Sequence, residues 1–371
     1  MPSQMSHKER ILAAINHEPA DQLPTYAFKC ELGFLIKWDE RFEVKDESFV
    51  RFSQDQTILV ELGVDGTTDP SLGDIMELSG FQSYKHEDGS TVHANGRRYK
   101  KSSTGENFYV GGAWTSLEER KKFPKRVMRS ESHYEAFEKF YKKKVLEEDK
   151  IFIWPIINGF HEGIWLSIGY AAFAKEIRKP TGLLKYCVDE LYKVNLEICK
   201  RLLDIDNEMI IAFTDDIAQK RRLMIAPKYV KKFYGKRTKQ LFDYIHKRGG
   251  KTMIHTDGDI SDLIPYYIDV GLDLLQCLEP AAGVDIIALN EQYGDKIAWN
   301  GNIDVSRLLW KGSPADVRKQ CKKIISAVAP SNNLVLGPCT DIMTFHSIDN
   351  IIAMYETARS YDTTEHKFKN Q

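Results

Sequence analysis

Short apolar runs that alternate with long amphipathic segments constrain the fold of this chain more than any other feature of its sequence. Such alternation is typical of parallel strands that are joined by crossover helices. The apolar runs predict eight strands, at Leu23–Phe28, Leu59–Thr67, Ile151–Ile157, Met209–Phe213, Lys251–His255, Leu272–Leu278, Lys296–Asn300 and Asn333–Gly337. The amphipathic segments predict helices at Leu183–Leu203, Pro227–Lys247, Ile260–Val270, Ile286–Tyr293, Pro314–Val328 and Ile348–Ser360.

Eight strands with helices after them predict an α/β fold, a single (β/α)8 TIM-type barrel that spans residues 1–371. A helix over Ser6–His17 precedes the barrel, with Ser6 and Glu9 spaced for a capping box. The alternative is an open doubly wound sheet, but the Gly-rich phosphate loop usual in that fold does not occur in this sequence. Turn signals within about 81–109 predict a small β-meander insertion, which is either a lid or docking surface or a decoration without function.

The composition excludes several classes of function. The chain has 52 Lys and Arg against 53 Asp and Glu, a net charge of −1, so no strong field attracts nucleic acid or an anionic membrane. No apolar run approaches the ~20 residues that a membrane span needs, and the first residues lack the apolar core of a signal peptide. We therefore expect a cytoplasmic protein whose six cysteines are thiols. The oligomeric state stays open, and a homodimer is compatible with the sequence.

The strand ends of such a barrel build its active site, and here they hold many potential metal ligands. His255 and Asp257 lie two residues apart at one strand end, Glu279 follows the next strand, and Cys339 follows the last. Imidazole, carboxylate and thiolate all bind zinc, so these four residues are the predicted metal ligands, with Cys277 as a competitor of Glu279. The alternative is that each side chain is simply packed and hydrogen-bonded.

Further polar residues follow the other strands. Asp215 and Asp216 come after the fourth strand, where a carboxylate either caps the next turn or holds a substrate proton or cation. Asn302 follows Gly301, which lets the backbone approach a ligand. Asp215, Asp216 and Asn302 are therefore the candidate catalytic residues. The candidate substrate-binding residues are Tyr26, Phe28, Trp154, Trp165 and Asn300. The alternative for the aromatic residues is that they belong to the core.

Several of these segments resemble uroporphyrinogen-decarboxylase-like proteins in order and spacing, over essentially the whole chain. The segments that carry the resemblance are Glu9–Leu12, Asp21–Pro24, Phe213–Ala218, His255–Asp259, Trp299–Val305 and Asp349–Met354. True uroporphyrinogen decarboxylases carry an Arg-rich segment after the first strand, which binds the porphyrinogen carboxylates. The corresponding stretch here, Tyr26–Gly33, has one Lys and no Arg, so that reaction is not expected.

The resemblance extends to a second branch, the methyltransferases that work with a separate corrinoid protein carrying cobalamin. Their thiol-alkylating relatives bind zinc through a His-x-Cys pair, sometimes a Glu, and a distant Cys. This chain has His255-x-Asp257, with Glu279 and Cys339 lying 22 and 82 residues after Asp257, so Asp257 stands in place of the first Cys. One thiolate with two carboxylates makes a harder site than two thiolates, and a harder site suits an oxygen ligand.

The resemblance and the donor set together predict a methyltransferase. It would move a methyl group from a small-molecule donor, a methoxylated aromatic or another methyl ether, to the Co(I) of a partner corrinoid protein, with zinc as Lewis acid. The alternatives are transfer from methylcobalamin to a thiol, decarboxylation of another carboxylate, and a non-catalytic scaffold.

Overall fold

Eight parallel strands form the centre of the molecule. The computed structural model describes residues 4–38, 58–77, 80–103 and 105–369. In sheet order the strands are β1 (Tyr26–Ala27), β2 (Gly66–Asp69), β9 (Phe152–Asn158), β10 (Ile210–Thr214), β13 (Lys251–Thr256), β14 (Leu274–Cys277), β15 (Ala298–Ile303) and β16 (Leu334–Pro338). The Leu336 amide donates to the Pro24 carbonyl at 2.9 Å, and a parallel bridge joins Thr25 to Leu336. The first and last strands therefore meet, and the predicted TIM-type barrel is confirmed.

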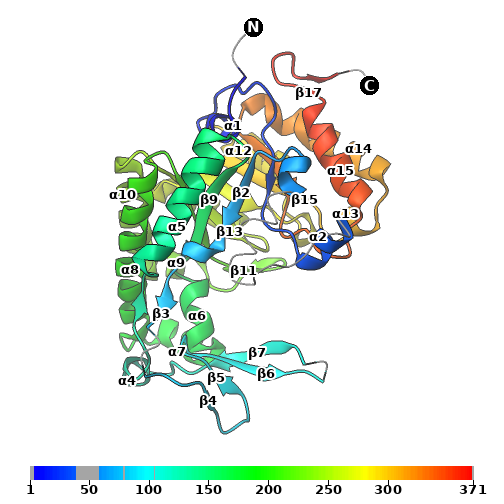
Figure 1. Cartoon of the computed structure of the whole chain (residues 1–371). Helices are drawn as coiled ribbons and strands as arrows, with labels where there is room; N and C mark the ends of the chain where they lie inside the picture. The colour runs from blue at the N-terminus through cyan, green and yellow to red at the C-terminus, as the bar shows by residue number, and fades with distance from the viewer. Residues whose placement is uncertain (1–3, 39–57, 78–79, 104, 370–371) are drawn as a thin grey trace.

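Helices surround this sheet and extend into a lobe beside it (Figure 1). They are α1 (His7–Ile15), α2 (Leu32–Trp38), α4 (Leu117–Lys121), α5 (Glu131–Tyr141), α6 (Glu162–Ile168), α7 (Tyr170–Arg178), α8 (Leu183–Ile205), α9 (Pro227–Phe233), α10 (Gly235–Lys247), α11 (Ile264–Val270), α12 (Ile286–Tyr293), α13 (Leu308–Lys311), α14 (Pro314–Val328) and α15 (Ile348–Arg359). The helix predicted over 227–247 is divided at Tyr234, and the other predicted helices lie within a few residues of their expected bounds. Among the described residues, no helix is long and apolar enough to cross a membrane.

The second strand lies further along the chain than the sequence indicates. The expected strand was Leu59–Thr67, but residues 58–61 are helical and β2 covers Gly66–Asp69. Ile58, Leu59 and Leu62 are buried at helical spacing, and a short apolar run does not distinguish a buried strand from a buried helical turn. The correction moves the end of the strand to Asp69, which therefore lies at the mouth of the barrel.

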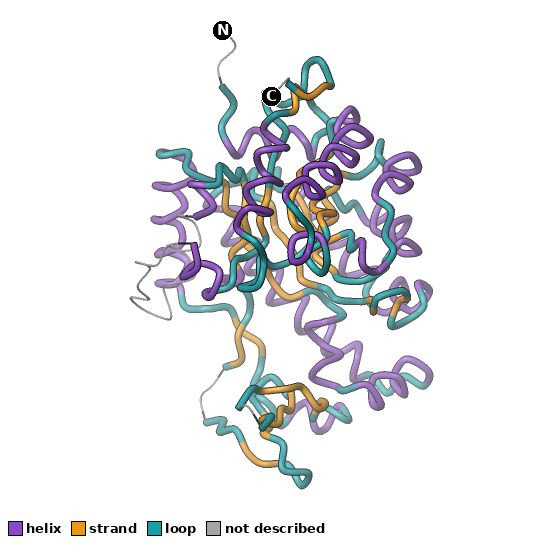
Figure 2. The backbone as a smooth tube through the Cα atoms, turned by 90° about the vertical axis from the view of Figure 1, so that its right-hand side faces the viewer, coloured by secondary structure: helices purple, strands orange, loops and turns teal. Residues whose placement is uncertain are grey.

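The predicted β-meander is present. It consists of β4 (Tyr84–Lys85), β5 (Thr91–Val92), β6 (Arg97–Lys101) and β7 (Asn107–Gly112), paired antiparallel in that order. Together with α6 and α7 it forms a lobe that stands away from the barrel, on the side where strand β9 leads into α6 (Figures 1 and 2). The Tyr109 hydroxyl donates to the Leu166 carbonyl at 2.8 Å, and the Trp114 amide donates to the Ser167 carbonyl at 3.0 Å. These bonds attach the insertion to the helix that follows β9.

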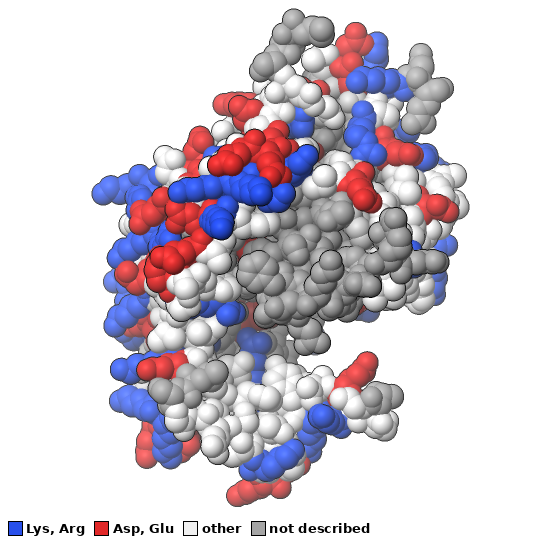
Figure 3. Space-filling model, viewed as in Figure 1, with Lys and Arg blue, Asp and Glu red and all other residues white. Residues whose placement is uncertain are grey.

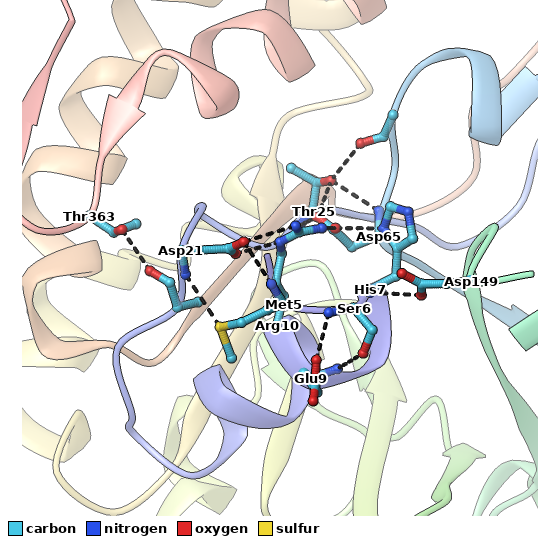
Figure 4. A network of polar contacts seen from close by, with 12 residues as sticks. Met5, Ser6, His7, Glu9, Arg10, Asp21, Thr25, Asp65, Asp149 and Thr363 are labelled. Carbon is cyan, nitrogen blue, oxygen red and sulfur yellow. Dashed lines mark hydrogen bonds and ion pairs between the residues drawn. The ribbon is translucent and has the colours of Figure 1, made fainter. Parts of the chain in front are cut away.

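A polar network fixes α1 to the opposite end of the barrel (Figure 4). Ser6 and Glu9 form the predicted capping box at the start of this helix. Arg10 reaches Asp21 at 2.6 Å and Asp65 at 3.1 Å. The Asp65 carboxylate also accepts from the amide and hydroxyl groups of Thr25, at 2.9 and 3.0 Å. Since Thr25 and Asp65 immediately precede β1 and β2, this network holds the entry ends of both strands and lies away from the mouth.

Candidate metal centre

Three potential metal ligands meet at the carboxyl ends of neighbouring strands. One ligand atom each from Asp216, His255 and Asp257 lies within 4.8 Å of the others. His255 belongs to β13, Asp257 follows that strand directly, and Asp216 comes two residues after the end of β10. Parallel pairing sets Thr214 beside His255, which brings the two strand ends together. The cluster thus contains two of the predicted ligands, His255 and Asp257, together with Asp216, which was predicted to be catalytic.

The His255 ring is oriented by contacts on two sides. Its Nδ1 hydrogen-bonds the Gln276 side-chain oxygen, and Phe28 stacks on the ring with centroids 4.3 Å apart and planes 12° apart. Gln276 is itself fixed, because its amide nitrogen donates to the Cys339 carbonyl at 2.9 Å. The second ring nitrogen, Nε2, lies 3.8 Å from Asp257 Oδ1. This arrangement keeps the proton on Nδ1 and leaves the Nε2 lone pair directed at the carboxylates, as a metal ligand requires.

The two carboxylates of the cluster lie close together in a partly buried position. Asp216 Oδ1 accepts from the Asp257 amide at 2.8 Å. Burial raises the pKa of Asp216, an electrostatic interaction with the protonated form of His255 would oppose this shift, and the Asp257 carboxylate adds to it. Burial and carboxylate repulsion both disfavour two negative charges here, and a bound cation would compensate both costs. The electrostatics therefore fit a metal ion.

The remaining two predicted ligands lie beside this cluster. Cys277 Sγ is 3.0 Å from Asp257 Oδ1, and a hydrogen bond with Cys339 together with burial raises the pKa of the Cys277 thiol well above its usual value. Glu279 Oε2 accepts from the Gly258 amide at 3.0 Å, next to Asp257. The three-residue cluster contains neither Glu279 nor Cys339. In this arrangement Cys339 contacts the cluster through Cys277, and Glu279 supports the loop that carries Asp257.

The candidate catalytic residues occupy different surroundings. Asp215 Oδ1 accepts from the amides of His161 and Glu162, at 2.6 and 3.0 Å, so this carboxylate caps the turn that begins α6. Burial raises the pKa of Asp215 to about 7. Asn302 has a φ of 72° and donates to the Leu278 carbonyl at 2.5 Å. It therefore joins the ends of β14 and β15 close to the cluster.

The five candidate substrate-binding residues have different surroundings. Phe28 lies on the cluster, against His255. Tyr26 and Trp154 stack on each other inside the barrel, with centroids 5.3 Å apart, whereas Trp165 packs on Tyr170 in the lobe. Asn300 is fully buried, and neither its side-chain oxygen nor its nitrogen has a hydrogen-bond partner among the described residues. Such an unpaired amide is costly unless water or a ligand reaches it, and substrate binding by Asn300 stays a prediction.

Three residues at the mouth were not predicted from the sequence. Gln276, which orients His255, lies within a strand, where side chains are usually packed. Burial and the neighbouring Asp216 raise the pKa of Glu162, which immediately follows the buried His161. Burial also raises the pKa of Asp69 to about 7, and Asp69 Oδ2 has no partner among the described residues. Only Asp69 had a sequence signal, its place at the end of a strand, and the misplaced bounds of β2 concealed it.

The fold and the site together define an α/β-barrel enzyme with an imidazole and carboxylate cluster at its mouth. Residues 163–361, more than half of the chain, match the family model described as uroporphyrinogen decarboxylase (URO-D), and the chain belongs to that family. Its fold is similar to that of a methyltransferase from Methanosarcina mazei, with a TM-score of 0.69 and 17% identity over 96% of this chain and 98% of the other. Comparison with curated proteins gives no match.

Proposed function

We propose that this protein is a corrinoid-dependent methyltransferase that removes the methyl group from a methyl ether, in the first place a methoxylated aromatic. The observation that carries the proposal is the cluster of Asp216, His255 and Asp257, whose ligand atoms lie within 4.8 Å of one another. One nitrogen and two oxygen donors suit zinc with a position left for substrate, and this hard donor set favours an oxygen ligand over a thiol. The family membership and the fold shared with a methyltransferase agree with it.

The protein's own residues would bind the donor and handle the proton. Zinc, when bound, would supply Lewis acidity toward the ether oxygen. In the overall reaction the bond between that oxygen and the methyl carbon would break, and the Co(I) of the partner protein would supply the electron pair that accepts the methyl group. The departing oxygen then needs a proton. We assign this role to Glu162, because burial raises its pKa and electrostatic interactions link it to both Asp216 and His255.

Methyl transfer from methylcobalamin to a thiol is the second candidate function. The observation in its favour is the Cys277 thiol, 3.0 Å from Asp257 Oδ1 and in contact with Cys339, which offers softer donors beside the cluster. Ligation by either sulfur would shift the site toward a thiol substrate. The two functions use the same partner and differ in the direction in which the methyl group moves.

Metal content and methyl transfer test the proposal together. The purified protein should hold about one zinc per chain, and His255→Ala and Asp216→Asn should each lose it while keeping their helical circular dichroism. Asp262→Asn, at an exposed position soon after the cluster, is the matched control and should retain the metal. With a reduced corrinoid protein, wild-type enzyme should convert a methoxyaromatic to the phenol and methylate cobalt, which absorbance detects.

Two results would contradict these expectations. If both cluster variants keep one zinc per chain and full methyl transfer, the cluster is not the metal site. If no methoxyaromatic in a broad panel methylates cobalt while a thiol reacts with methylcobalamin, the second candidate function replaces the first.

A further inference from the structure

A cavity of about 520 Å³ lies between the β-meander lobe and the barrel. Its walls come from β3 (Ile75–Met76), from the turn between β5 and β6, and from Asn158 at the carboxyl end of β9. A volume of this size accommodates a ring-sized small molecule. Figure 3 shows the recess between the lobe and the barrel, with basic side chains at its back.

The charges that line the cavity do not cancel. Arg126 Nη1 is 2.7 Å from Asp74 Oδ2, and the Asn158 side chain donates to the other Asp74 oxygen at 2.7 Å. This pair is neutral. Arg97 also lines the cavity, and its guanidinium has no ion-pair or hydrogen-bond partner in the described part of the chain, although its Nε is buried. A buried donor without a partner is costly, so an acceptor from outside the protein would complete the site.

The meander holds Arg97 in a fixed place. The Asn95 side chain accepts from the Arg97 amide at 3.0 Å, and Arg97 pairs with Gly112 across β6 and β7. Gly96 has a φ of 76°, and a Cβ at this position would lie 2.3 Å from Trp114 Nε1, so the turn that precedes Arg97 requires glycine. Because the backbone is already ordered, little conformational entropy is lost when a ligand binds.

The cavity that Arg97 lines also reaches the strand ends beside the candidate metal centre. Asn158, which lines the cavity, pairs in register with Thr214 at the end of β10, and Asp216 follows two residues later. One end of the cavity is therefore close to the cluster, while Ile75, Met76 and Phe81 supply apolar wall.

We propose that Arg97 binds the carboxylate of the substrate, so that the methyl donor is an anionic, ring-sized acid whose apolar body packs in this cavity. The proposal rests on the function proposed above and adds the charge of the substrate to it. A guanidinium binds a carboxylate through two parallel hydrogen bonds, which fixes direction as well as charge. With its carboxylate at Arg97, the substrate is oriented so that its other end faces the cluster. The insertion then has a defined role, the recognition of charge.

Calorimetric titration with benzoate and with uncharged benzyl alcohol tests the proposal without corrinoid protein or methyl transfer. Wild-type protein should bind benzoate about 10-fold more tightly than benzyl alcohol, as expected of a charged hydrogen bond. Arg97→Gln should abolish this preference and leave the affinity for benzyl alcohol unchanged. Lys101→Gln, an exposed cation at the other end of β6, is the matched control and should behave as wild type. Arg97→Lys keeps the charge but not the paired geometry, and should retain part of the preference.

Two outcomes would overturn the proposal: equal binding of benzoate and benzyl alcohol by the wild type, or a full preference for benzoate in Arg97→Gln. If Arg97→Gln does not fold, a reduced preference in Arg97→Lys supports the site and an unchanged preference rejects it. A preference for benzoate that depends on Arg97, found together with no cobalt methylation from any methyl ether, would keep the anion site and reject ether demethylation.

Discussion

His161 is fully buried beside the candidate metal centre, and its titration gives a quantitative expectation for stability. Its Nδ1 lies 3.3 Å from the Tyr234 hydroxyl, Nε2 has no partner among the described residues, and Phe173 packs edge-on against the ring. Burial lowers the pKa of His161 from 6.5 to about 3. The folded protein therefore keeps this imidazole neutral under conditions in which the unfolded chain protonates it.

The sign and size of the effect follow from proton linkage. Between 6.5 and about 3 the unfolded state binds more protons at this residue than the folded state, so the free energy of unfolding falls as the pH drops through that window. A pH of about 5 lies about 1.5 units below the pKa of the imidazole in the unfolded chain. At about 1.36 kcal/mol per unit, the free energy of unfolding is therefore about 2 kcal/mol lower than at about pH 8.

His161→Phe removes the titrating group and keeps an aromatic ring in the same packing. It loses the contact with Tyr234 at every pH, so its absolute stability is not the test. Urea unfolding followed by tryptophan fluorescence should show that wild type loses about 2 kcal/mol more than the variant between about pH 8 and about pH 5. His366→Gln changes an exposed histidine and should follow wild type. Parallel pH curves for wild type and His161→Phe would refute the reasoning.

Two further substitutions separate the two ends of the barrel. Gln276→Leu removes the hydrogen bond to His255 Nδ1 and should weaken zinc binding about 10-fold to 100-fold in a chelator competition titration, while Gln276→Glu keeps an acceptor and most of the affinity. Unchanged affinity in Gln276→Leu would show that the imidazole does not bind the metal. Asp65→Asn takes the charge from the buried partner of Arg10 and should lower the free energy of unfolding by about 3 kcal/mol in urea, with zinc content unaffected. A cost below about 1 kcal/mol would mean that Asp21 alone compensates Arg10.

The spacing of apolar residues was sufficient to predict the barrel, but it did not predict where every strand begins and ends. Helices α12 and α14 match their expected bounds because Asp285 and Ser313 cap them locally. Strand β2 was misplaced because the apolar residues before it form a buried helical turn, and its own residues, Gly66–Asp69, carry no apolar pattern. Tertiary pairing with β9 defines that strand, and a single sequence does not contain this information.

The residues of the candidate site also divide into those that the sequence could predict and those that it could not. His255 and Asp257 could be found because they follow the regular alternation of β13 to its end. Cys277 and Leu278 have φ values of 108° and 53°, so the backbone after β14 leaves the extended region before Glu279. Alternation along the strand therefore does not determine where the Glu279 side chain points. Residues beyond such a bend can be assigned to the mouth from the sequence, but not to the first contacts of a metal ion.

An anionic substrate requires both the candidate metal centre and a cation that binds its charge. The segment after β1 contributes to the first, and the insertion supplies the second. Lys29 is the cation of Tyr26–Gly33, and its Nζ lies 2.9 Å from Asp341 Oδ2, so its charge is already compensated. Phe28 in the same segment stacks on His255 of the candidate metal centre. The guanidinium without a partner among the described residues comes instead from Arg97 in the meander. Metal affinity and preference for a charged ligand should therefore separate by mutation. Phe28→Leu should weaken zinc binding and keep the preference for benzoate, and Arg97→Gln should do the reverse. Loss of both properties in either variant would mean that the lobe and the barrel mouth form one inseparable site.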